Sequence, residues 1–149
     1  MNIHRLKKQL KIDEGVRSRV YMKDDKRIVG VGHIIDETAP EWLANKNIGE
    51  AITDEQLDLL FMDDLTIAIA VVKTIFEPMW DDLSSCSKEG LSNLCFAIGK
   101  DELLQLKEFI YFIYQGDLDN AEKDLINTPW GINNTARAIR IMRMINRED

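Results

Sequence analysis

The sequence predicts an α+β fold that is mostly helical, in which a long helix connects a small β-hairpin lobe to a helical C-terminal lobe. Three observations predict this architecture. Two runs with strand-like composition, 16–22 and 27–34, flank a short polar turn, which is typical of a hairpin. A helix-capping sequence at Thr53 opens a long apolar stripe. After Pro78, apolar residues recur at helical spacing almost to the end of the chain.

A short amphipathic helix over residues 1–12 precedes the hairpin. Its apolar side chains fall at helical spacing: Ile3, Leu6 and Leu10. Gly15 suits the end of this helix, because glycine readily adopts the left-handed conformation that terminates helices. Gly30 and Gly32 alternate in the second extended run, where a side chain would block a close approach from one face. Residues 36–50 are expected to form a loop or a short irregular helix.

The connecting helix is the clearest element. Thr53 and Gln56 form a capping box, in which each side chain binds the backbone amide of the other residue. One apolar stripe follows on a single helical face: Leu57, Phe61, Leu65, Ala68, Val72 and Ile75. The sequence therefore predicts one continuous helix over residues 53–75.

The C-terminal lobe is predicted to contain four helices. The first covers 91–98 and is closed by Gly99, and the second is a buried helix over 103–114 that stops near Gly116. Asp117 can cap a third, short helix. Asn133 or Asn134 can cap the last helix, whose stripe comprises Ala138, Ile141, Met142 and Ile145.

The composition fits one compact domain over residues 1–149. It has 45% hydrophobic and 30% charged residues, which is enough for a sizeable core. We expect one lobe over 13–52, the connecting helix over 53–75, and a second lobe over 76–149 on which helix 1–12 packs. The longest uncharged stretch, 65–72, is too short to cross a bilayer, and the N-terminus lacks the apolar core of a signal peptide. We therefore expect synthesis in the cytoplasm and no membrane insertion.

Charge and cysteine content narrow the function further. A net charge of −7 argues against nucleic-acid binding, which needs a basic face. Cys86 and Cys95 lie among apolar neighbours, so we expect buried free thiols rather than a disulfide framework. The two histidines, His4 and His33, are distant from them in the sequence, so no metal site is expected.

Three carboxylates are candidates for chemistry. Glu14 lies at the end of the first helix, immediately before the hairpin, and Asp24 and Asp25 lie in the hairpin turn. Paired carboxylates cut glycosidic bonds, because one protonates the leaving oxygen while the other activates water or attacks the sugar. The alternative is that Glu14 is a solvated charge and that the two aspartates serve the turn backbone.

Several motifs, in their order and spacing, resemble the T-even bacteriophage lysozyme family, glycoside hydrolase family 24. The opening signature comprises Ile12-Asp13-Glu14-Gly15, then Tyr21, then Gly30-Val31-Gly32-His33. Residues 52–64 resemble the start of the family's interdomain helix. The C-terminal lobe matches at Asn93, Phe96, Gly99, Trp130, Asn134 and Arg137. The resemblance covers roughly residues 1–143 and implies a lysozyme-like fold.

The resemblance also implies roles for individual residues. Glu14 matches the general acid, and Arg137 matches an arginine that faces this glutamate. His33 and Asp64 match a structural ion pair between the hairpin lobe and the long helix. Substrate-binding or site-supporting roles fall on Ile28, Gly32, Phe96 and Arg137.

The chain departs from the family pattern where the attacking water is held. The family has an aspartate two residues after the tyrosine and a threonine before the Gly-x-Gly segment, whereas this chain has Lys23 and Ile28. The chain is one residue shorter between Glu14 and His33, so counting from His33 brings Asp24 nearer to the aspartate's place. Ala97 replaces a glutamine that touches the sugar. An isoleucine cannot hold water, so activity is expected to be slow.

The resemblance thus implies a muramidase that cuts between N-acetylmuramic acid and N-acetylglucosamine, with Glu14 as acid and Asp24 as base. Its partner would be bacterial peptidoglycan, it would need no cofactor, and it would act as a monomer. As a phage endolysin in host lysis, it would reach the cell wall after release by a separate permeabilising protein. The alternative is a catalytically inactive module that binds peptidoglycan or serves in a phage particle.

Overall fold

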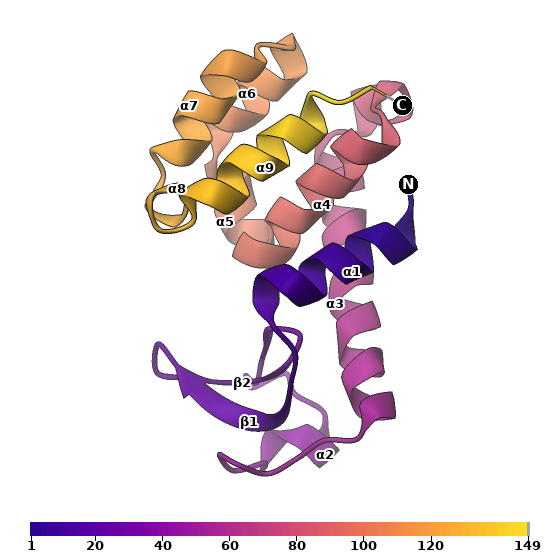
Figure 1. Ribbon diagram of the computed structural model, residues 1–149, viewed down its shortest axis with the longest axis vertical. Coiled ribbons are helices and arrows are strands. Elements are labelled where there is room, and N and C mark those ends of the chain that lie inside the picture. The colour runs from indigo at the N-terminus through magenta and orange to yellow at the C-terminus, as the bar shows by residue number, and fades with distance from the viewer. Residues whose placement is uncertain (149) are drawn as a thin grey trace. The chain divides into compact units, whose positions relative to one another are not determined.

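The structure, a computed structural model, describes residues 1–148 (Figure 1). In chain order its elements are α1 (Ile3–Glu14), β1 (Arg17–Lys23), β2 (Lys26–Gly30), β3 (His33–Ile34), α2 (Glu41–Ala44), α3 (Asp54–Ile75), the 3₁₀ helix η1 (Glu77–Asp82), α4 (Ser85–Ile98), α5 (Lys100–Gln105), α6 (Lys107–Gln115), α7 (Leu118–Ile126), α8 (Pro129–Asn133) and α9 (Thr135–Ile145). The predicted fold class, α+β and mostly helical, is confirmed. None of the helices within residues 1–148 has the length and apolar character needed to cross a membrane.

The chain divides into two compact units. The hairpin unit comprises Lys7–Thr66, and the helical unit comprises Met1–Leu6 together with the chain from Ile67 onward. Helices α1 and α3 each contribute residues to both units. The predicted second lobe ended at Asp149, which lies outside the described residues. That the two units form a single domain stays a prediction.

The hairpin forms at the predicted place. Strands β1 and β2 pair antiparallel, with Tyr21 opposite Ile28 and Lys23 opposite Lys26. Asp24 and Asp25 form the two-residue turn, and both have positive φ, at 52° and 62°. Two positive φ values define a type I′ turn, whose twist matches that of the flanking strands, and aspartate tolerates this conformation better than most residues.

The second extended run was expected to be one strand, and this expectation was wrong. The run splits into β2 and β3, which pair antiparallel in a three-stranded sheet of order β1-β2-β3. The break occurs at Gly30 and Gly32, whose φ values are 69° and 65°. Glycine adopts this left-handed region without steric cost, so the chain can turn back within two residues. The pattern of residue types alone did not reveal this reversal.

Helix α3 is continuous, as predicted. Both capping-box bonds are present: the Gln56 amide donates to Thr53 Oγ1 at 3.1 Å, and the Thr53 amide donates to Gln56 Oε1 at 3.0 Å. The apolar stripe is buried along the helix at Leu57, Phe61, Leu65, Ala68 and Val72. Local capping and one apolar face therefore suffice to define this helix.

The helical unit is built around α4, along which α9 lies (Figure 1). Gly90 allows this close packing, because a Cβ there would lie 3.1 Å from the carbonyl oxygen of Ile141. The core contains residues from most of the surrounding helices: Phe76, Leu91, Leu94, Leu103, Phe109, Leu125 and Ile141. All four residues of the predicted last stripe, Ala138, Ile141, Met142 and Ile145, are buried. The last helix therefore presents the predicted face to the core.

The ends of these helices mostly agree with the sequence. Gly99 closes α4 and Gly116 closes α6, both with positive φ, and Asp117 caps α7 by accepting a bond from the Asn120 amide. Two expectations were wrong. The helix predicted over 103–114 is interrupted at Leu106, and Asn134 precedes α9 without a side-chain capping bond. Helix α8 was not predicted because it has only five residues.

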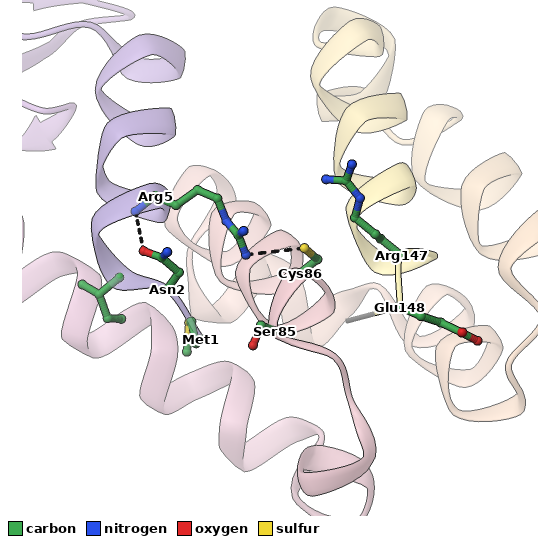
Figure 2. A pocket seen from close by; sticks show the side chains of 8 residues that line it. Met1, Asn2, Arg5, Ser85, Cys86, Arg147 and Glu148 are labelled. Atoms are coloured by element: carbon green, nitrogen blue, oxygen red, sulfur yellow. Dashed lines mark hydrogen bonds between the residues drawn. The ribbon is translucent and has the colours of Figure 1, made fainter.

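A buried carboxylate that was not predicted from the sequence joins α1 to α4 inside the helical unit. Glu89 is fully buried and accepts two bonds from the Arg5 guanidinium, at 2.8 and 2.9 Å, and one from the Asn2 amide at 2.7 Å. Figure 2 shows Arg5 reaching toward Cys86, whose sulfur also accepts from Arg5. A buried carboxylate with this set of partners is satisfied electrostatically, so its role is structural.

Candidate active site

Glu14 is the last residue of α1 and is half-buried. The helix ends there because Gly15 adopts φ 75°, and its amide donates to the carbonyl oxygen of Lys11 at 3.0 Å. Residues with a Cβ rarely adopt such a φ, so Gly15 releases the chain from the helix directly after the carboxylate. The local sequence thus fixes where Glu14 stands on its helix.

The Glu14 side chain lies against the backbone of Gly32 within the hairpin unit. A Cβ on Gly32 would lie 2.9 Å from Glu14 Oε2 and 3.4 Å from its Cβ and Cδ. The first distance is shorter than real Cβ contacts, so any side chain on Gly32 would make the Glu14 carboxylate shift, and the φ of 65° at Gly32 also favours glycine. The predicted close approach at the alternating glycines therefore occurs at Gly32. A Cβ on Gly30 would lie 3.6 Å from Cγ of Leu57, which is an ordinary van der Waals contact.

His33 and Asp64 meet in the same unit. His33 Nδ1 lies 2.7 Å from Asp64 Oδ2, and both side chains are partly shielded from solvent. His33 begins β3, and Asp64 lies midway along α3. The contact ties the two-residue edge strand to the helix, and β3 directly follows the turn that contains Gly32.

Tyr21, Lys23 and Ile28 share one face of the hairpin. Tyr21 and Lys23 are two residues apart on β1, and Ile28 is the direct partner of Tyr21. Ile28 is only 9% exposed. The position two residues after Tyr21 therefore carries a lysine ammonium on the same face as Ile28, and no carboxylate.

Asp24 and Asp25 lie at the exposed tip of the hairpin. The ladder between β1 and β2 runs from Gly30 to Lys26, five residues of strand joined by four steps, and the turn follows at the Lys26 end. At the rise of an extended strand this amounts to about 13 Å along β2. The atoms nearest to a Cβ at Gly32 all belong to Glu14, and neither aspartate is among them.

In the helical unit, the predicted site residues cluster on α4 and α9. Asn93 is fully buried, and its Oδ1 accepts a bond from Arg137 Nε at 3.0 Å. The Arg137 guanidinium lies 6.0 Å from the centroid of the Trp130 ring. Phe96 and Ala97 follow on α4 and are half-buried. The structure thus brings Asn93 and Arg137 together, and the expectation that Arg137 faces Glu14 stays a prediction.

Both cysteines are free thiols, as expected from the sequence. Cys86 and Cys95 are both buried and unbonded to each other. Burial raises the pKa of the Cys95 thiol to about 11, which keeps it protonated near neutral pH. Within residues 1–148, no three side chains of histidine, cysteine, aspartate or glutamate are grouped so as to hold a metal ion.

The hairpin carries a set of contacts that was not predicted from the sequence. The Arg17 guanidinium lies 4.2 Å from the centroid of the Tyr21 ring. Lys23 and Lys26 are both exposed and lie directly opposite each other, with Lys23 two residues after Tyr21 on β1. The alternation of basic residues along β1 was the available signal in the sequence.

Comparison with known proteins gives one informative match. No protein-family model matches the chain. Over 158 aligned residues it is 24% identical to the probable T4-type lysozyme 1 of Dictyostelium discoideum. The alignment covers 94% of this chain and 92% of that protein. The chain is therefore similar, at low identity, to a T4-type lysozyme along nearly its whole length.

Proposed function

We propose that this protein is a peptidoglycan muramidase of the lysozyme type, in which Glu14 is the general acid. The observation that carries the proposal is the Glu14 carboxylate at the end of α1, lying against Gly32. A general acid must be held in one orientation so that its proton reaches the leaving oxygen of the glycosidic bond. The similarity to a T4-type lysozyme supports the same reaction class.

Asp24 is the base that we propose for activating the water. In glycosidases that use a water directly, the two carboxyl groups lie about 6.5–9.5 Å apart. The turn that carries Asp24 follows about 13 Å of strand from Gly30, so its carboxylate would have to reach back along the sheet. Ile28 offers no hydroxyl to hold the water. The enzyme should therefore be slow.

Release of reducing sugar from purified peptidoglycan tests this proposal. Glu14→Gln keeps the size and hydrogen-bonding capacity of the side chain but removes the transferable proton, so release should fall at least about 10²-fold. Asp24→Asn should slow release, whereas Asp25→Asn should leave it unchanged. A Glu14→Gln protein that is as active as the wild type would overturn the assignment. If only Asp25→Asn stops release, the two turn residues exchange roles.

A second candidate is a lysozyme-like module that binds peptidoglycan without cutting it. The specific observation in its favour is Lys23, which stands on the face of Ile28 where a base would be needed. Binding to intact cell-wall sacculi, with no sugar release even at high protein concentration, would favour this module over the enzyme.

A further inference from the structure

The hairpin is basic although the chain is acidic. Residues 17–27 contain five arginines and lysines against two aspartates, whereas the whole chain has 19 basic and 26 acidic residues. Two of the five serve the fold. Arg19 donates to the carbonyl oxygen of Gly49 at 2.8 Å, and Arg27 donates to that of Ala44 at 3.0 Å. The other three are Arg17, Lys23 and Lys26.

These three side chains share one face with Tyr21. Lys23 is two residues from Tyr21 on β1, so both side chains point to the same face. Lys26 is the direct cross-strand partner of Lys23 and therefore also lies on this face. The Arg17 guanidinium lies over the Tyr21 ring at 4.2 Å. We call Arg17, Tyr21, Lys23 and Lys26 the cationic face.

The two lysines of this face have no acidic partner within ion-pair distance among residues 1–148. Like charges directly opposite each other destabilise an antiparallel pair, so the arrangement does not serve the stability of the hairpin. Stacking on Tyr21 leaves the edge of the Arg17 guanidinium, with its N–H donors, available to an acceptor. The carboxylates within residues 17–27, Asp24 and Asp25, lie in the turn between the two lysines. With five cations against two anions, this hairpin carries an excess of positive charge, which is complementary to an anionic ligand.

We propose that the cationic face binds the carboxylates of peptidoglycan, those on the muramic acid sugars and on the peptide stems. The inference rests on the proposed function and names the chemical groups that the site would recognise. With a net charge of −7, the chain as a whole repels long polyanions such as DNA. Scattered carboxylates on a polymer of sugar rings can instead be bound locally by a few cations.

Co-sedimentation with sacculi tests this proposal. The protein should carry Glu14→Gln so that it does not degrade the polymer during the measurement. Lys23→Gln with Lys26→Gln should weaken binding about tenfold, as expected for two exposed charge contacts. The matched control, Lys8→Gln with Lys73→Gln, removes the same charge from two exposed lysines elsewhere and should bind as before. If the double variant fails to fold, Lys26→Gln alone should show a smaller loss.

Two further arms separate the possible failures. Sacculi whose carboxylates have been amidated should bind the unsubstituted hairpin about tenfold less, and raising the salt from about 0.05 to about 0.5 M should abolish the difference. Equal binding to native and amidated sacculi would overturn the inference while the proposed function stands. Absence of binding to any sacculi would overturn both the inference about the cationic face and the proposed function. Tighter binding to a DNA duplex, with the same lysine dependence, would assign the face to nucleic acid instead.

Discussion

The contact between Glu14 and Gly32 gives a test of the proposed acid at the scale of one residue. Gly32→Ala introduces a methyl group that must displace the Glu14 carboxylate, since it would lie 2.9 Å from Oε2. The positive φ adds a backbone cost of about 1–2 kcal/mol. We expect sugar release to fall at least about tenfold at matched folded concentration.

Gly49→Ala is the control for this substitution. Gly49 also has a positive φ, 88°, but no atom lies within 4 Å of the place that a Cβ would take. Gly49→Ala should therefore lower the free energy of unfolding about as much as Gly32→Ala does, as measured by denaturant titration. It should leave sugar release unchanged. Equal activity of the two variants would mean that Gly32 does not position the acid.

Ile28 tests the water site. Because Ile28 is buried, Ile28→Thr should cost stability, in contrast to an exposed position where the change would be nearly neutral. Truncation alone costs about 0.5–1.5 kcal/mol, and an unpaired buried hydroxyl costs about 1–3 kcal/mol. If a water is the missing element, the hydroxyl should nevertheless raise sugar release about tenfold or more.

Ile28→Val separates the two effects of that substitution, because valine has the shape of threonine without its hydroxyl. It should lower stability modestly and leave sugar release unchanged. A gain in rate with valine as large as with threonine would assign the effect to space rather than to the hydroxyl. No gain with threonine, in a folded protein, would favour the binding module.

At the scale of secondary-structure elements, the sequence predicted what depends on neighbours along the chain. The capping box at Thr53 and the stripe of α3 are local, so both were predictable. The third strand depends on backbone angles at Gly30 and Gly32, which residue type permits but does not require. The role of Glu89 depends on Arg5, 84 residues away, and no periodicity encodes such a pairing.

In the candidate site, too, features set by neighbouring residues were predictable and features set by strand pairing were not. The position of Glu14 at a helix end before a hairpin was predictable, because Gly15 marks that end. The cross-strand register was not, and it is the register that sets Lys23 opposite Lys26 and on the face of Ile28. A one-residue shift would have sent these side chains to the other face, so a shortened hairpin leaves the assignment open until the pairing is known.

Helix α8 depends on a contact that excludes any side chain. A Cβ on Gly131 would overlap the carbonyl oxygen of Leu125, and this backbone atom cannot move without shifting the end of α7. Gly131→Ala should lower the free energy of unfolding by about 3 kcal/mol or more. In the same helix, Ile132→Ala alters an exposed side chain and should change the free energy of unfolding by less than about 0.5 kcal/mol. Denaturant titration of both variants measures the difference. Tolerance of alanine at Gly131 would contradict the packing of α8 on α7.

At the scale of the whole molecule, charge distribution matters more than net charge. The chain carries a net charge of −7, which disfavours long-range attraction to an anionic wall. Binding should then depend on short-range contacts at the cationic face and fall steeply with salt. The dependence of stability on pH should likewise come from a few groups, those whose environment differs between the folded and unfolded states.

Two aspartates are predicted to act on that dependence with opposite signs. Burial, and then the neighbouring Glu108, raise the pKa of Asp124 above its ordinary value of 3.8, while a bond from the Phe109 amide opposes the rise. The folded protein therefore holds this proton more tightly than the unfolded chain, and the stability it contributes in acid is lost as the pH rises through the raised pKa. Bonds from the Thr38 hydroxyl and amide lower the pKa of Asp36. Its contribution is present above pH 3.8 and is lost as the pH falls through the lowered pKa.

Substitution by asparagine should reveal both signs. Asp124→Asn keeps an acceptor for the Phe109 amide but cannot ionise, so it should be more stable than the wild type near neutral pH, and the gain should vanish toward about pH 3. Asp36→Asn should be less stable near neutral pH, and its loss should shrink over the same acidic range. Denaturant midpoints measured from about pH 3 to about pH 8 give both curves. If the two variants differ from the wild type with the same sign near neutral pH, the opposing environments inferred for Asp124 and Asp36 are wrong, because pKa shifts of opposite direction require differences of opposite sign.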